Sequence, residues 1–205
     1  RLIMPIAING SGTVTGISVG GLPDGIVDTD MIAAGAVTAA KRGAGAILQV
    51  VNVEKTDATS QVNQSARTDI SGMSATITPS ATSSKILILS DLNIGMPNGG
   101  YHVNLHLMRG STDIAKGTGA SGSGNANAVD VTASYREVAA GLGNAPVSTS
   151  VLDSPNTTSA TTYKWQWHVP NYSNQTIYLN RNVSQTNYPY NTWKSSRLIL
   201  LEVAG

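Results

Sequence analysis

The chain contains no cysteine and no phenylalanine. Without cysteine it can form neither disulfides nor thiolate metal sites. Without phenylalanine, its aromatic side chains are those of 7 tyrosines and 3 tryptophans, which suit half-exposed surfaces and interfaces because each ring also carries a polar group. These absences exclude a disulfide scaffold and any cysteine-based metal centre.

Charge is also scarce. Charged residues make up 12% of the chain, about half of the usual share of roughly 25%. The net charge of +1 lacks the excess of basic residues typical of nucleic-acid binders, so we expect no nucleic-acid partner. No stretch approaches the ~20 apolar residues that span a membrane, so we expect no membrane insertion. Abundant β-branched residues and polar turns indicate a folded, strand-rich chain rather than a disordered one.

Short segments with alternating apolar and polar residues dominate the chain after residue 46. The clearest is Tyr163–Val169, whose odd-numbered residues are apolar or aromatic and whose even-numbered residues are polar, the period of a half-buried strand. Further strands are expected at Ile47–Val53, Ala75–Thr78, Ser84–Ser90, Tyr101–Arg109, Val129–Glu137, Val147–Leu152, Thr176–Arg181 and Ser196–Val203. Such strands, joined by turns rich in Gly, Asn, Ser and Pro, predict an all-β antiparallel sandwich or jelly roll over residues 47–205.

The first 46 residues divide into two short pieces. Residues 1–28 contain a predicted hairpin with Asn9-Gly10 as its turn. Residues 29–46 form a predicted neck, either short helical turns or irregular chain, that begins at the cap residue Thr29. Both pieces are too short to be stable alone, so each needs a partner surface.

The segment from Gly20 to Ile47 indicates assembly. It has too few large apolar residues to form a core, yet apolar residues recur every few positions, unlike in a flexible linker. Its apolar side can be buried only against another surface, which favours identical chains wrapped around each other or docked on a larger body. We expect a trimer neck in which symmetry-related copies of these residues pack together as in a short coiled coil: Ile26, Met31, Ile32 and Val37.

No residue pattern identifies a catalytic centre. The chain has no GxSxG elbow, no HExxH helix and no suggestive pair of carboxylates. Gly117–Gly122 spells GxGxxG, but it lies in a polar tract with no helix after it, so we interpret it as a loop. We therefore expect no enzyme activity, no cofactor and no metal, although a site assembled in space by the fold stays open.

Two histidines lie four residues apart on one predicted strand. The side chains of His102 and His106 should be about 13 Å apart, too far to share a metal within one chain. We interpret them as polar residues that face solvent. The alternative is that each meets its symmetry mates around an ion on the axis of a trimer.

A polar loop near the C-terminus carries three aromatic residues, Tyr188, Tyr190 and Trp193. Exposed aromatic rings beside Asn and Thr form the kind of surface on which sugar rings stack and hydrogen-bond, so we predict receptor binding here. The alternative is that these rings pack on the edge of the sandwich or on a neighbouring subunit. Gly95–Gly100 is a second candidate tip.

Several blocks of the chain resemble small fibre proteins of tailed bacteriophages, common in phages of marine and freshwater bacteria. The blocks are INGSGTVTGISVGGLPDGIVD at Ile8–Asp28, DMIAAGAVTAAKRGAGAILQVV at Asp30–Val51, ITPSATSSKILI at Ile77–Ile88, SVLDSPNTTSATTYKWQW at Ser150–Trp167 and SSRLILLEVAG at Ser195–Gly205. The resemblance implies a homotrimeric virion appendage with an N-terminal anchor, a short intertwined neck and a C-terminal β-sandwich head that meets the host. In that family the last loop is short and acidic, whereas this chain has the three aromatic residues there.

Three functions are therefore considered. The first is a trimeric tail fibre that attaches to other virion proteins through its N-terminal segment and binds a host surface glycan or protein through its head, without catalysis. The second is a capsid or collar decoration, or a head fibre, of the same architecture. The third is a spike that degrades glycans, although such spikes are usually long repetitive β-helices and no repeats are visible here.

Overall fold

The computed structural model describes residues 7–8, 14–15, 36–37, 41–62, 66–97, 102–119, 130–136, 144–169, 175–184, 189 and 191–205. The chain divides into two compact units, Arg1–Arg42 and Gly43–Gly205. In the first unit, β1 (Ala7–Ile8) and β2 (Val14–Thr15) pair antiparallel, with Ile8 opposite Val14. The pairing of these two short strands agrees with a hairpin, but the predicted turn at Asn9-Gly10 lies outside the described residues.

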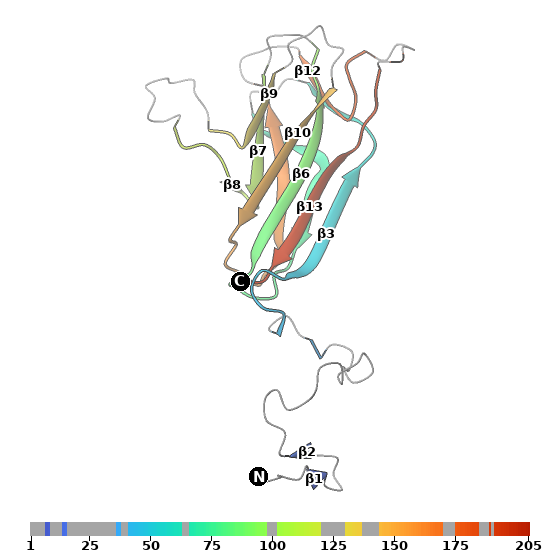
Figure 1. The fold of residues 1–205 in the computed structure, drawn as a ribbon. Helices are drawn as coiled ribbons and strands as arrows, with labels where there is room; N and C mark the ends of the chain where they lie inside the picture. Colours follow the sequence, from blue (N-terminus) through green and yellow to red (C-terminus); the bar gives the residue numbers. More distant parts are fainter. Residues whose placement is uncertain are drawn as a thin grey trace. The chain divides into compact units, whose positions relative to one another are not determined.

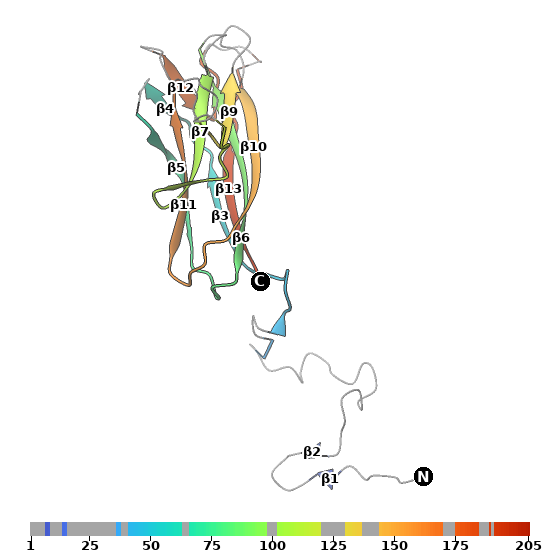
Figure 2. The ribbon, with the colours of Figure 1, turned by 90° about the vertical axis from the view of Figure 1, so that its left-hand side faces the viewer.

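The second unit is built from strands alone in its described residues. They are β3 (Ile47–Lys55), β4 (Thr59–Val62), β5 (Thr68–Ile77), β6 (Lys85–Gly95), β7 (His102–Arg109), β8 (Thr112–Ile114), β9 (Ala133–Arg136), β10 (Asn144–Asp153), β11 (Thr161–His168), β12 (Thr176–Leu179) and β13 (Ser196–Val203). The strands form two antiparallel sheets that pack face to face (Figure 1; Figure 2). The predicted all-β sandwich is confirmed.

The order of the strands is that of a jelly roll. The first sheet runs β3–β13–β6–β10, with β12 and β4 continuing it beyond the end of β13. The second runs β5–β11–β7, and β8 and β9 both pair with the free edge of β7. The main strands β3, β5, β6, β7, β9, β10, β11 and β13 can be renumbered 1 to 8 along the chain, with β8 counted together with β9. The two sheets then have the strand orders 1-8-3-6 and 2-7-4-5, which is the double Greek key of a jelly roll.

The core lies between the two sheets and follows the alternation of the strands. On β11, Tyr163, Trp165 and Trp167 point inward and are fully buried. They pack with the inward residues of the opposite sheet, among them Ile88 on β6 and Leu200 on β13. Each large aromatic ring buries roughly 150–250 Å², so these three side chains contribute much of the apolar burial.

A hydrogen bond inside the core joins the sheets. The indole Nε1 of Trp165 donates to Ser90 Oγ at 2.8 Å, and Ser90 Oγ donates to the backbone oxygen of Arg197 at 3.0 Å. A buried indole N–H without a partner would cost about 1–3 kcal/mol, so Ser90 allows a tryptophan to occupy this position.

A buried carboxylate closes the end of the jelly roll at which the chain arrives from Gly43. Glu202 on β13 is fully buried. It accepts hydrogen bonds from Gln49 Nε2 and from both the backbone N and the Oγ of Ser80, each at 2.6 Å. Burial raises the pKa of Glu202, but the hydrogen bonds from Ser80, Gln49 and Ser84 together hold it below its ordinary value. The carboxylate is thus a charged clamp between β3, β13 and the turn before β6.

Most predicted strands are present with altered ends. The strand predicted at Ala75–Thr78 begins earlier, at Thr68, and contains a bulge near Gly72, whose φ is 80°. The strand predicted to reach Arg181 ends at Leu179, because Asn180 turns into the left-handed region with φ 68°. The short strands β4 and β8 were not predicted.

We predict that Glu202→Gln lowers the free energy of unfolding at neutral pH by about 1.5–3 kcal/mol, because it removes the charge from a buried, fully hydrogen-bonded group. Since the pKa of Glu202 is lower in the folded state, its contribution is complete above the ordinary glutamate pKa and is lost as the pH falls through the folded value. Urea unfolding of both proteins across this range should show the difference shrinking in acid.

The control for this prediction is Asp69→Asn, which neutralises an exposed carboxylate paired with the partly exposed Lys164. Its effect should be much smaller because solvent screens exposed pairs. An equal effect of the two variants would contradict the role assigned to Glu202.

Candidate functional site

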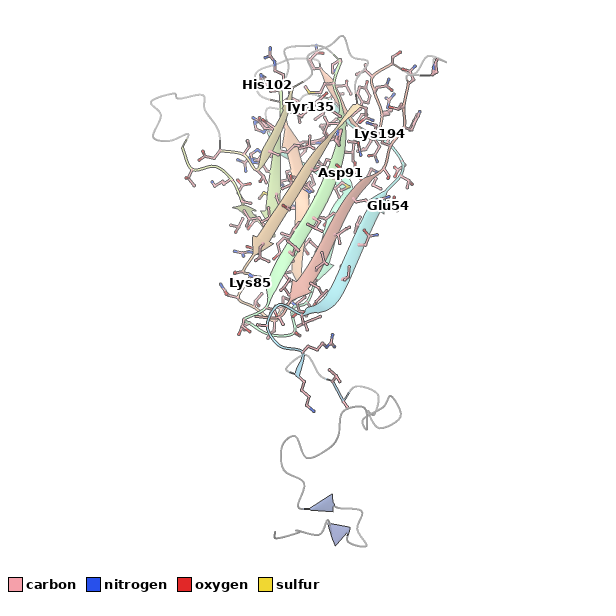
Figure 3. All side chains as sticks on the ribbon, in the orientation of Figure 1. Glu54, Lys85, Asp91, His102, Tyr135 and Lys194 are labelled. Carbon is pink, nitrogen blue, oxygen red and sulfur yellow. The ribbon has the colours of Figure 1, made fainter. Side chains whose placement is uncertain are left out.

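The candidate site lies at the end of the jelly roll away from Lys85, where Figure 3 shows His102, Tyr135 and Lys194. Here the chain leaves β12, forms a loop and returns to β13. Arg181 and Trp193 form an isolated antiparallel bridge across the base of this loop, and Lys194 N donates to Asn180 O at 2.9 Å. The backbone at Trp193 is therefore fixed to the sandwich.

The side chain of Trp193 nevertheless points to solvent and is 60% exposed. Arg181 lies directly opposite Trp193 in the bridge, so the two side chains share one face of the loop base. The guanidinium of Arg181 sits 4.1 Å from the centre of the Tyr178 ring, an arrangement that holds the cation by cation–π attraction. A large apolar ring beside an ordered cation is thus presented at this surface.

Asn180 anchors the loop base from within. Its side chain is fully buried, donates from Nδ2 to the backbone oxygens of Lys55 and Asp57 at 2.7 and 2.9 Å, and accepts from Ser196 Oγ at 2.5 Å. Its backbone N also donates to Asn93 O at 2.8 Å. Asparagine enters the left-handed region more readily than most residues, so one residue supplies both the sharp turn and the polar contacts.

Two more contacts fix the surroundings of Trp193. A Cβ on Gly95 would lie 2.2 Å from the backbone oxygen of Arg181, so only glycine lets β6 and the loop base approach this closely. Lys194 Nζ donates to the backbone oxygen of Asn144 at 2.5 Å, which ties the loop base to the start of β10. Together with the contact between Asn180 and Lys55, these contacts hold the loop base against β3, β6 and β10.

The structure places only part of the predicted receptor surface. Trp193 is exposed on the fixed loop base, whereas Tyr188 and Tyr190 lie outside the described residues, so the grouping of the three rings stays a prediction. Arg181, Tyr178 and Asn180 were missed by sequence reasoning. An asparagine at the end of a predicted strand was the available signal, since asparagine is favoured in turns.

Of the four apolar residues predicted to pack in the neck, the structure describes Val37 alone. Val37 is exposed within the first unit, and Ile26, Met31 and Ile32 lie outside the described residues. The trimer neck therefore stays a prediction.

The prediction that His106 faces solvent is wrong. His106 is fully buried, with Nε2 3.3 Å from Nδ1 of His168 and Nδ1 3.4 Å from Asp113 Oδ1. Arg67 pairs with the same aspartate. Alternation along β7 correctly separates the two sides of the strand, but it does not reveal that Arg67 and the short strand β8 cover the second side. A buried His106 is also unavailable to symmetry mates, so the axial ion site is wrong for this residue.

His106 and His168 are both held neutral at neutral pH. Burial lowers the pKa of His106 to about 4, and the nearby charge of Arg67 acts in the same direction. Burial also lowers the pKa of His168. Within the described ranges, no three His, Cys, Asp or Glu side chains lie close enough together to hold a metal ion. The pair is therefore a packed polar element of the second sheet.

We predict that acid destabilises the protein partly through His106. Its folded pKa is depressed, so unfolded chains take up protons that the folded chain resists, and stability falls as the pH drops from about 6.5 toward 4. His106→Gln should show a shallower loss of the urea midpoint over this range. His102→Gln changes an exposed histidine of the same strand and should retain the wild-type slope; equal slopes in all three proteins would refute the assignment.

No protein-family model matches this sequence, and no curated protein matches it either. Among solved structures, this chain is similar to a chain in the structure of infectious bursal disease virus of the Gt strain, at 13% identity and a TM-score of 0.39. It is also similar to the VP2 subviral particle of that virus, at 12% identity and a TM-score of 0.35. The alignments cover 77% of this chain and 38% and 37% of those chains, so this chain spans less than two fifths of their length. Similarities at this level carry no argument about function.

Proposed function

We propose that this chain is a structural protein of a bacteriophage particle, a homotrimeric tail fibre whose jelly roll binds a glycan on the host surface without catalysing a reaction. The observation that carries the proposal is the exposure of Trp193 on a rigid loop base. A 60% exposed indole contributes little to the core, whereas a sugar ring can cover it and hydrogen-bond to the polar groups around it.

The surroundings of Trp193 suit a neutral polar ligand. Arg181 is already held over Tyr178, and Asn182 Nδ2 donates to Asn191 Oδ1 at 2.7 Å, so both sides of the loop base carry ordered polar groups. Ordered groups lose little entropy on binding, which favours recognition of hydroxyl-rich rings. The described residues offer no metal cluster and no helix long and apolar enough to cross a membrane.

The two compact units suit an appendage. The unit Arg1–Arg42 would attach to other virion proteins and trimerise through the neck, and the unit Gly43–Gly205 would form the head. The jelly roll is an architecture shared by viral capsid and lectin domains, which is an analogy at the level of the fold. A capsid or collar decoration of the same build is the second candidate, and antibody labelling of the head on intact particles separates tail from capsid attachment.

We predict that Trp193→Ala weakens attachment to host cells by about tenfold or more, since an exposed aromatic anchor carries much of the energy of such a contact. The fold should be unchanged because the side chain is mostly in solvent. Adsorption of purified protein to host cells measures the effect. Trp193→Phe keeps an aromatic face and should retain most of the binding. Unchanged adsorption of the alanine variant would return Trp193 to a structural role, and turnover of host polysaccharide by the wild type would favour a degrading spike.

We predict that mass photometry of the full chain gives three times the 21.2 kDa chain mass. Deleting residues 1–46 should leave a folded head, because the core lies entirely within the second unit, and should abolish incorporation into particles. Circular dichroism and phage assembly in the presence of the tagged protein measure the two effects. A monomeric full chain would refute the neck, and an unfolded remainder would refute the boundary.

A further inference from the structure

The outer face of the first sheet carries an ordered pattern of side chains across four strands. This face, formed by β3, β13, β6 and β10, is turned toward the viewer in Figure 1 and Figure 3. The strand register sets its side chains in straight rows. The apolar row is Val50, Leu201, Leu87 and Leu152; the middle row is Asn52, Ile199, Leu89 and Ser150; the charged row is Glu54, Arg197, Asp91 and Ser148.

The apolar row is exposed to solvent although it crosses the whole sheet. Val50 and Leu152 at its two edges are 58% and 54% exposed, and Leu89 in the next row is 37% exposed. With strands ~4.8 Å apart and same-face residues ~6.8 Å apart, the three rows cover on the order of 400 Å². Six of the twelve residues in the rows are aliphatic and adjoin one another in the apolar and middle rows, so the apolar part covers about half of this area.

The two halves of this face match each other row by row. One half belongs to β3 and β13, and the other to β6 and β10. In the charged row, Arg197 of the first half corresponds to Asp91 of the second, and Glu54 corresponds to Ser148. In the middle row an apolar and a polar residue stand in each half, and in the apolar row all four residues are aliphatic. The first half of one copy is therefore complementary in charge and polarity to the second half of another.

The charged row can form further hydrogen bonds in such a contact. Arg197 donates from Nε and Nη2 to Glu54 Oε1 at 3.2 and 3.0 Å, which uses two of its five donors. Asp91 Oδ1 accepts from Ser148 Oγ at 3.0 Å, and a carboxylate has about four acceptor sites. A depression of about 440 Å³ extends over the middle and charged rows between β10 and β13, with Asp91 and Arg197 both in its lining. A side chain from a neighbour can enter it and meet either charge.

Charge also fixes the direction in which two copies meet. If two copies point in the same direction along their strands, each row of one copy meets the corresponding row of the other. If the copies point in opposite directions, the charged row meets the row of Ile47, Val203 and Lys85. Asp91 then faces aliphatic groups, and Arg197 faces the like charge of Lys85, so both contacts are unfavourable. In the parallel arrangement every copy receives its chain at the same end, which is what an assembly joined through its N-terminal segments requires.

We propose that this outer face is the contact between copies of the chain in the second unit, with the β3–β13 half of one copy against the β6–β10 half of the next and all copies pointing in the same direction. The proposal rests on the proposed homotrimer and adds its head interface. Three copies bury three such contacts around an axis along the strands.

The test is a paired-cysteine variant, Val50→Cys with Leu152→Cys. Within one chain these positions are three strand spacings apart, about 14 Å, too far for a disulfide, which needs Cα atoms within about 7 Å. Between parallel copies they lie in the same row on facing edges. Because the natural chain has no cysteine, any disulfide reports only this pair. On a non-reducing gel after mild oxidation, the variant should run as a closed covalent trimer.

The control pair is Val62→Cys with Leu152→Cys, because Val62 is also 58% exposed but lies on β4, beyond the rows. It should stay unlinked. Covalent trimers that form in the first variant alone support the proposal. Unlinked chains in a protein that mass photometry shows to be trimeric overturn this interface but leave the trimer standing. Monomeric chains overturn both the interface and the trimer. If both variants give the same set of cross-linked species, the disulfides come from random collisions, and the interface is overturned.

A second variant covers the case in which oxidation itself perturbs the fold. Leu152→Lys places a charge in the apolar row and should weaken association of the chains by roughly tenfold, the equivalent of about 1.4 kcal/mol. Val62→Lys should leave association unchanged. Concentration-dependent mass photometry measures both, and equal effects of the two lysines would overturn the interface.

Discussion

Burial of the aromatic side chains of β11 is the constraint on which the fold depends. Tyr163, Trp165 and Trp167 occupy the space between the sheets, and the Trp165–Ser90 hydrogen bond fixes the second sheet against the first. This position obliges β11 to lie inside its sheet, between β5 and β7, and obliges β6 to present Ser90 inward. Leu89 and Asp91, the neighbours of Ser90, must then face outward, so the inner packing also determines what the outer face displays.

Much of the fold could be predicted from the sequence because alternation is a local signal. The pattern of Tyr163–Val169 predicted a half-buried strand, and the structure confirms it. The prediction failed where a residue changes the backbone without changing the pattern of apolar residues. The bulge near Gly72 hid the first half of β5, and the left-handed turn at Asn180 ended β12 early. Both features depend on contacts with distant residues, which no local pattern contains.

The candidate surfaces were predicted less well, because each is assembled from strands far apart in the chain. Trp193 could be chosen as an exposed aromatic in a polar loop, but the support that Asn180 gives to it comes from Lys55 and Asp57. The apolar row likewise joins residues from four strands that are adjacent only in the jelly-roll order. Taken singly, Val50 and Leu152 look like ordinary strand residues, and only the register reveals that they share one line.

The loop base that holds Trp193 has a consequence for how the sequence of such a protein can change over time. The bridge between Arg181 and Trp193, the clamp at Asn180 and the close approach at Gly95 rest on backbone atoms and on residues outside the loop. Asn182 belongs to this support, because it is fully buried and donates to Asn191, so exchange without loss of these contacts is limited to the residues between Asn182 and Asn191. A support of this kind allows the intervening sequence to diverge while the sandwich stays constant, as is usual for segments that connect secondary-structure elements.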